Sequence, residues 1–221
     1  MTLTDSDRVS LQRRLSDSLK DEVKMLVFTL QGISASNDLV DLARTIASAS
    51  PKIKVEVETV VDGKNQRLRD LRMENAPALV LVKEDFSRIR YYGIPAGYEI
   101  PPIIDALVEL SNHSTPLSPN AKATLATIRR RANIKIFVLT TCTFCPIVAR
   151  HAYRAAIESP KVTAEVIDSQ LFQDLATRHS VMGVPKIILN DNTDITGAIQ
   201  EADFFQKLKD SDIAQIDSMF G

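Results

Sequence analysis

The sequence predicts a mixed α/β protein built from two similar units in tandem, and three observations point to this fold class. First, 221 residues are enough for one large domain or two small ones with buried cores. Second, short apolar runs typical of strands are interspersed with stretches in which apolar residues recur every three or four positions, as in helices. Third, the second half of the chain repeats the first half almost without gaps.

The internal repeat becomes visible when 109 is subtracted from the residue numbers of the second half. Pro160-Lys161 then falls on Pro51-Lys52, and further along Val184-Pro185 matches Ala76-Pro77 with an offset of 108. Few of these matches are improbable alone, but their order along the chain is the same in both halves. The repeat therefore predicts two units of the same fold.

We expect one domain at residues 1–114 and a second at 115–221, joined by the linker His113-Ser114-Thr115-Pro116. Each domain is expected to run helix, strand, helix, strand, short helix, two strands and a last helix. In the first domain these are Ser6–Ser18, Lys24–Leu30, Asn37–Ser48, Ile53–Thr59, Asn65–Met73, Ala78–Lys83, Arg88–Tyr92 and Pro102–Ser111. In the second they are Pro119–Arg131, Ile134–Leu139, Pro146–Glu158, Val162–Ile167, Leu171–His179, Lys186–Asn190, Asp194–Gly197 and Ala202–Lys209.

The two cysteines of the chain, Cys142 and Cys145, stand at C-x-x-C spacing between a predicted strand and a predicted helix. A thiol at a helix N-terminus faces unpaired backbone N–H groups and the positive end of the helix dipole, which favour the nucleophilic thiolate. We expect Cys142, at the helix entrance, to attack a disulfide and Cys145, one turn in, to resolve the mixed disulfide. Pro146 fits a first helical turn, where its missing N–H removes no hydrogen bond.

The expected series of elements is that of a thioredoxin-type domain, a mixed central sheet flanked by helices. In this architecture Val184-Pro185 precedes the third strand of the second domain and lies opposite the cysteines. A cis peptide there, which the fold favours, would leave the backbone of Val184 free to pair with an incoming extended polypeptide. Phe144, between the cysteines, is a second candidate for contact with a partner, although it could equally well only cover the site.

Other chemistry is less well supported. A zinc site would need two ligands besides the cysteines, and His113, His151 and His179 do not stand at suitable spacings, so we expect no metal. His151 is expected to be solvated or to lie near a helix cap. The seven glycines include no G-x-G-x-x-G arrangement, so no dinucleotide cofactor is expected.

Composition limits the class of partner. A net charge of −1 favours neither nucleic acid nor an anionic membrane, and no apolar run approaches the ~20 residues that span a bilayer. The polar N-terminus lacks the apolar core of a secretory signal. Because a disulfide between two such closely spaced cysteines would not stabilise the fold by linking distant segments, the sequence predicts a cytoplasmic protein with a functional cysteine pair.

Three stretches resemble known proteins: Cys142-Thr143-Phe144-Cys145-Pro146, Val181-Met182-Gly183-Val184-Pro185, and Tyr92–Glu99, which reads YGIPAGYE. With them the chain, over nearly its full length, is similar to the tandem thioredoxin-fold protein disulfide oxidoreductases, which are glutaredoxin-like. It is similar as well to the N-terminal domain of the alkyl hydroperoxide reductase flavoprotein subunit. The resemblance implies a tandem thioredoxin-like fold.

The resemblance further implies that Glu99 reaches from the first unit towards the active cysteines. A thioredoxin places a buried carboxylate six residues ahead of its first cysteine, where this chain has Ile136. Glu99 would supply that missing group, and burial would raise its pKa towards the range that suits proton transfer. A plain helix-start glutamate, favoured by the helix dipole, is an equally good interpretation.

The chain departs from the tandem oxidoreductases in its first unit, where Ile33 and Ser36 replace a second cysteine pair. Since no flavoprotein body is encoded either, electrons are expected from a separate flavoprotein or other reductase. The predicted function is thiol–disulfide exchange at Cys142 and Cys145 with protein disulfides, with a peroxiredoxin as an expected acceptor. The alternative is a peptide-binding, chaperone-like module without redox turnover.

Overall fold

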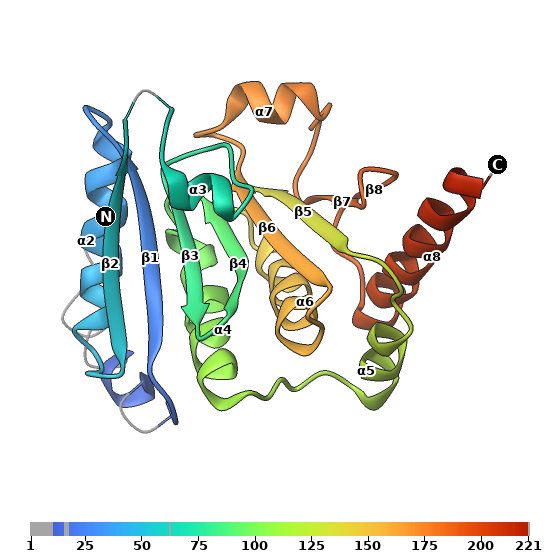
Figure 1. Ribbon diagram of the computed structural model, residues 1–221, viewed down its shortest axis with the longest axis horizontal. Coiled ribbons are helices and arrows are strands. Elements are labelled where there is room, and N and C mark those ends of the chain that lie inside the picture. Colours follow the sequence, from blue (N-terminus) through green and yellow to red (C-terminus); the bar gives the residue numbers. More distant parts are fainter. Residues whose placement is uncertain (1–10, 16–17, 62, 221) are drawn as a thin grey trace.

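The computed structural model describes residues 11–15, 18–61 and 63–220, apart from the side chains of 215–220. All eight strands belong to one mixed sheet in the order β2-β1-β3-β4-β6-β5-β7-β8, which Figure 1 shows edge to edge across the molecule. The first four positions come from the first half of the chain and the last four from the second half. Each half therefore contributes the same sheet, with the same internal order.

The elements follow the predicted series. The strands are β1 Val23–Leu30, β2 Ile53–Val60, β3 Ala78–Lys83, β4 Phe86–Tyr92, β5 Ala132–Val138, β6 Val162–Asp168, β7 Lys186–Leu189 and β8 Thr193–Thr196. The helices are α2 Ser34–Ala47, α3 Gln66–Asp70, the 3-10 turn η1 Gly97–Glu99, α4 Ile100–Asn112, α5 Pro119–Ala126, α6 Cys145–Glu158, α7 Gln173–Arg178 and α8 Glu201–Phe220.

The prediction of two tandem thioredoxin-like domains is confirmed as a fold class, and most strand bounds lie within two residues of those expected. Three helices were misjudged in length. Helix α5 ends at Ala126, five residues before the predicted end, and α8 continues well beyond the predicted Lys209. Helix α3 has five residues because Arg72, just after it, takes a left-handed conformation at φ 54°. The predicted helix Ser6–Ser18 is helical at residues 11–15, and residues 6–10 and 16–17 lie outside the described residues.

The sheet separates two apolar cores. Helices α2, α4, α5, α6 and α8 contribute to the larger core on one face, whereas the short helices α3 and α7 cover part of the other. This follows from strand alternation: along β5, for example, Ile134 and Ile136 join the larger core, and Phe137 joins the smaller one. Among the described residues, no helix is both long and apolar enough to cross a membrane.

Lys52 and Lys161, which correspond to each other in the repeat, make equivalent hydrogen bonds. Lys52 donates from Nζ to the carbonyl oxygen of Leu19 at 2.8 Å, and Lys161 donates to that of Ile128 at 2.7 Å. Each lysine thus links the residue before the second strand of its half (β2 or β6) to the segment before the first strand (β1 or β5). Residues 114–118, which include the last three residues of the predicted linker His113–Pro116, form no helix or strand. The domain boundary after residue 114 stays a prediction.

The two halves are joined through their central strands and helices. Strand β4 pairs in parallel with β6, from Ile89 beside Ala164 to Tyr92 beside Ile167. On the larger-core face, two ion pairs link α4 with α6. Arg150 Nε donates to Asp105 at 2.7 Å, and Arg154 Nη2 lies 2.9 Å from Glu109. The two acids on α4 and the two arginines on α6 are each four residues apart, so each pair lies on one face of its helix and can meet the other pair.

The loop from Gly93 to Glu99 runs from the first half onto the second. The backbone N–H of Tyr98 donates to the carbonyl oxygen of Thr140 at 3.0 Å, two residues before Cys142. Gly97 has φ +56°, and a Cβ there would lie 2.5 Å from the same oxygen. A Cβ at Gly93, where φ is +108°, would lie 2.9 Å from Cβ of Asp168. Both glycines are required because a Cβ at either position would come too close to an atom of the second half.

Replacing Gly97 with Ala should lower the free energy of unfolding by about 2 kcal/mol or more, since the new methyl group meets Thr140 in an unfavourable backbone conformation. Gly32→Ala is the matched control: Gly32 has φ +78° but no atom within 4 Å of the added Cβ, so about 1 kcal/mol is expected. Urea unfolding of both variants measures the difference. Equal losses would show that the contact at Thr140 contributes nothing.

Candidate active site

The cysteine pair lies where β5 ends and α6 begins. Cys145 is the first residue of α6, so the prediction that it lies one turn inside the helix was wrong. Its backbone N–H donates to Sγ of Cys142 at 3.3 Å, and the Cys142 thiol faces the carbonyl oxygen of Val184 at 4.0 Å. A backbone donor aimed at sulfur stabilises negative charge there. The Cys142 sulfur thus lies between the N–H of Cys145 and the carbonyl oxygen of Val184.

The two thiols differ in access. Cys142 is half-buried, whereas Cys145 is fully buried. Burial raises the pKa of Cys145 well above its usual range, and the neighbouring Cys142 sulfur and the charge of Glu99 raise it further. At neutral pH Cys145 is thus a protonated thiol, shielded from solvent. Before it can attack a mixed disulfide, a base must remove its proton.

The predicted partner-contact residues lie around Cys142. The Val184-Pro185 peptide is cis, with Pro185 buried and Val184 half-buried beside the sulfur. Phe144 is 61% exposed and Met182, on the proline loop, is 96% exposed. Further exposed apolar side chains belong to neighbouring segments: Tyr98, Ile147 and Leu171. Together these five exposed side chains are called the apolar rim.

Glu99 ends the 3-10 turn η1 and is fully buried. Neither carboxylate oxygen has a hydrogen-bond partner among the described residues. The pKa of Glu99 is raised to about 7, mainly by burial; the guanidinium of Arg150 opposes the rise, and the charge of Asp168 adds to it. Its charge acts on the Cys145 thiol, so this carboxyl from the first half belongs to the surroundings of the cysteines.

Two tyrosines complete this buried polar cluster, and the sequence analysis did not identify them as site residues. Tyr91 on β4 and Tyr153 on α6 are buried, and their hydroxyls lack hydrogen-bond partners among the described residues. Burial raises the pKa of both phenols, and the charge of Glu99 adds to the rise in each. Four unpaired polar atoms in one cluster are unusual in a protein interior. A signal existed in the residue type: Tyr91 and Tyr153 occupy buried positions that a phenylalanine could fill.

His151 is the clearest error of the sequence analysis. It was expected to be solvated or cap-side, yet it is buried against the rings of Phe204 and Phe205 in α8, with centroid distances of 5.5 and 6.4 Å. Burial lowers its pKa. Both phenylalanines lie in the predicted helix Ala202–Lys209, but its packing over His151 was not predicted. Among the described residues no cluster of three or more His, Cys, Asp or Glu side chains is arranged to hold a metal ion.

The first half contains the same local structure without the chemistry. Ile33 is 43% exposed where Cys142 stands in the second half. Ser36 is buried, and its hydroxyl accepts a hydrogen bond from the N–H of Leu30 at 2.9 Å. The Ala76-Pro77 peptide is cis, as is Val184-Pro185. The first half retains this local backbone geometry but has no cysteine.

The fold and the C-x-x-C cysteine pair are those of thioredoxin-like proteins. A model of the thioredoxin domain family matches residues 132–210. The chain is 28% identical over 165 residues to the alkyl hydroperoxide reductase protein AhpF of Pseudomonas putida, a match that covers 75% of this chain and 30% of that protein. The chain thus spans about a third of the length of such relatives.

Solved structures extend the similarity to both halves. The N-terminal domain of alkyl hydroperoxide reductase AhpF from Enterococcus faecalis superposes with a TM-score of 0.86 at 26% identity, covering 94% of this chain and all of that one. A protein disulfide oxidoreductase from Aeropyrum pernix has the same fold, with a TM-score of 0.84 at 23% identity over 95% of this chain and 93% of that one. The resemblance stated from the sequence is confirmed.

The buried carboxyl should make stability depend on pH. Because the folded pKa of Glu99 is about 7 and its ordinary value is 4.5, folding favours the protonated form, and this contribution is lost as pH rises from about 4.5 through 7. The free energy of unfolding of wild type relative to Glu99→Gln should therefore fall by about 3 kcal/mol between pH 4 and pH 8. Urea unfolding across this range measures it. A difference independent of pH would contradict the raised pKa.

Proposed function

We propose that the protein catalyses thiol–disulfide exchange with other proteins through Cys142 and Cys145. The observation that supports this best is the pairing of one accessible and one buried thiol, with a backbone N–H from Cys145 aimed at the sulfur of Cys142. The apolar rim favours a polypeptide substrate, because it offers apolar contacts around the reactive sulfur.

The reaction proceeds in two steps. The Cys142 thiolate attacks one sulfur of a substrate disulfide, forms a mixed disulfide and releases the other substrate sulfur as a thiolate. Cys145 then loses its proton and attacks the sulfur of Cys142, which releases the second substrate thiolate and leaves an intramolecular disulfide. The substrate gains two electrons, and the dithiol loses them. Electrons return from a reductase that exchanges with the same pair.

Glu99 is the proposed base for the second step. Its raised pKa, about 7, means that close to half of the carboxyls are ionised at neutral pH, so it can both accept and return a proton there. No acidic side chain stands at Ile136, which is buried and apolar. The hydroxyls of Tyr91 and Tyr153 would lie along the path of the proton, which a buried water can carry.

The relatives suggest the physiological setting. Alkyl hydroperoxide reductase is named for the reduction of hydroperoxides, and this chain corresponds to less than a third of the length of the relative from Pseudomonas putida. We propose that the protein relays electrons from a separate flavoprotein or other reductase to a peroxiredoxin or another oxidised protein, in the cytoplasm. The non-redox alternative, a peptide-binding module, would use the same apolar rim without sulfur chemistry.

Cys142→Ser should abolish reduction of insulin disulfides in the presence of dithiothreitol, and Cys145→Ser should accumulate a mixed disulfide with the substrate, because its resolving thiol is missing. Nonreducing electrophoresis and mass spectrometry detect the trapped species. Oxidised wild type should be lighter than its reduced form by two hydrogens. Full activity in Cys142→Ser would refute the proposal, and peptide binding retained by the Cys142→Ser/Cys145→Ser variant would support the alternative.

Glu99→Gln should remove an inflection near pH 7 from the pH profile of Cys145 alkylation, since the carboxyl that ionises in this range is lost. The measurement follows iodoacetamide labelling of Cys145 in the Cys142→Ser background. Glu109→Gln is the control, because burial also raises the pKa of Glu109 but Arg154 pairs with it on the α4–α6 face. A profile unchanged by Glu99→Gln would exclude Glu99 as the base.

A further inference from the structure

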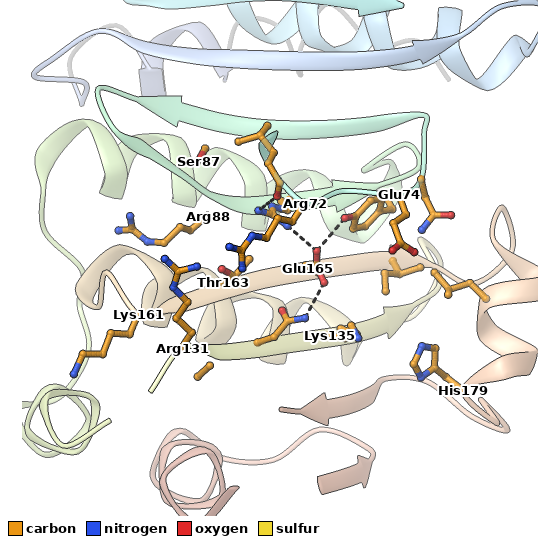
Figure 2. A pocket seen from close by; sticks show the side chains of 18 of the residues that line it. Arg72, Glu74, Ser87, Arg88, Arg131, Lys135, Lys161, Thr163, Glu165 and His179 are labelled. Carbon is orange, nitrogen blue, oxygen red and sulfur yellow. Dashed lines mark hydrogen bonds and ion pairs between the residues drawn. The ribbon is translucent and has the colours of Figure 1, made fainter. Parts of the chain in front are cut away.

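A second concave site lies on the face of the sheet opposite α6, away from the larger core. It has a volume of about 670 Å³, and Figure 2 shows it from close by. Strands β4, β6 and β5 form its floor, and the segment after α3 and helix α7 line its sides. This pocket, called the basic basin, therefore lies across the junction of the two halves of the chain.

Strand alternation explains why the basin is open and polar. On the three floor strands, residues towards α4 and α6 are apolar, whereas those facing the other way are polar over the first part of each strand. Further along, Tyr92, Phe137 and Ile167 take these positions and are covered by α3 and α7. The uncovered polar positions are Arg88, Arg90, Asn133, Lys135, Thr163 and Glu165.

Positive charge dominates the lining. Two of its cations are balanced: Arg90 lies 3.0 Å from Glu165, and Lys135 lies 2.6 Å from Asp191. Five others have no acidic partner among the described residues: Arg72, Arg88, Arg131, Lys161 and Arg178. Against them stand two unpaired acids of the lining, Asp70 and Glu74. A surplus of three positive charges is thus concentrated in a chain whose net charge is −1.

The unpaired cations are not spread evenly. In Figure 2 Arg88 and Arg131 lie at one end of the basin, beside Thr163, whereas Lys161 points away from them. Its Nζ donates to the carbonyl oxygen of Ile128 at 2.7 Å. Arg88 is held in place: its guanidinium donates to the carbonyl oxygen of Ala156 at 3.2 Å and lies 4.4 Å from the ring centroid of Phe86. Anchoring of this kind fixes a guanidinium before any ligand arrives and reduces the entropy lost on binding.

We propose that the basic basin binds a compact anion that carries two or more linked phosphate groups. Guanidinium groups match phosphate oxygens through paired hydrogen bonds, and the hydroxyl of Thr163 adds a neutral donor between them. The volume lies within the range of about 300–1,000 Å³ that is usual for small-molecule sites. Linked phosphates concentrate several negative charges within a few ångströms, which suits the two arginines at one end of the basin.

An acidic polypeptide fits less well. Its carboxylates are spread along a backbone that advances by about 3.3 Å per residue when extended, whereas the cations line a single pocket. The ligand contacts would come from both halves of the chain, Arg88 from the first and Arg131 from the second, so a bound anion would bridge the junction between β4 and β6. The proposed redox chemistry, on the other face of the sheet, does not depend on this site.

Titration calorimetry of the full chain tests the site with two probes, inorganic tripolyphosphate and ATP without magnesium. We expect saturable one-to-one binding of both, weakened by about tenfold or more in the Arg72→Gln/Arg131→Gln variant. Both arginines are exposed, so this variant should fold normally. Tighter binding of ATP would identify a nucleotide as the source of the phosphates, and equal binding would identify the phosphate chain alone.

The control is Arg44→Gln/Lys207→Gln, which removes two cations on α2 and α8 and changes the net charge by the same amount. This variant should bind tripolyphosphate like wild type. Equal losses in both variants would show non-specific attraction and overturn the proposal. So would the lack of saturable binding at concentrations up to about 1 mM, or binding of octaglutamate in preference to tripolyphosphate, which would indicate a polypeptide occupant.

Discussion

The backbone contact between Gly97 and Thr140 is the constraint on which the active site depends. It holds the end of the first half against the loop that leads to the cysteines, at a distance no side chain allows. Two residues later the same loop places the buried Glu99 near Cys145. The paired strands β4 and β6 and the ion pairs between α4 and α6 keep the two halves in this arrangement. The proposed active site is thus shared between the halves, although both cysteines come from the second half.

A carboxyl buried without a hydrogen bond is an unfavourable feature that folding alone does not explain. An apolar residue at the same position, such as the one at Ile136, would avoid this cost. Glu99 instead lies with Tyr91 and Tyr153 in a group of polar atoms that lack partners among the described residues, beside a thiol that must lose a proton. Local departures from good packing and hydrogen bonding are characteristic of functional sites, and this one coincides with the buried cysteine.

Much of the fold follows from the sequence because its signals are local and repeated. The strands are marked by apolar alternation, and the repeat assigns the same fold to both halves even where one lacks cysteines. What the sequence did not indicate depends on long-range packing. His151 is buried because α8 brings Phe204 and Phe205 over it, and Tyr153 gains its role only where β4 and α6 meet. The basic basin was missed for the same reason, since its cations lie far apart in the sequence and gather only when β4 pairs with β6.

The replacement of a cysteine pair by Ile33 and Ser36 limits how much reducing power one chain can hold. A protein with two dithiols can store two electron pairs or pass one pair between its own centres. This chain, with one cysteine pair, can hold a single electron pair, so an oxidised molecule has to be reduced again before it can reduce another target. Donor and acceptor would then compete for the same sulfur, and an excess of either would slow the overall flow.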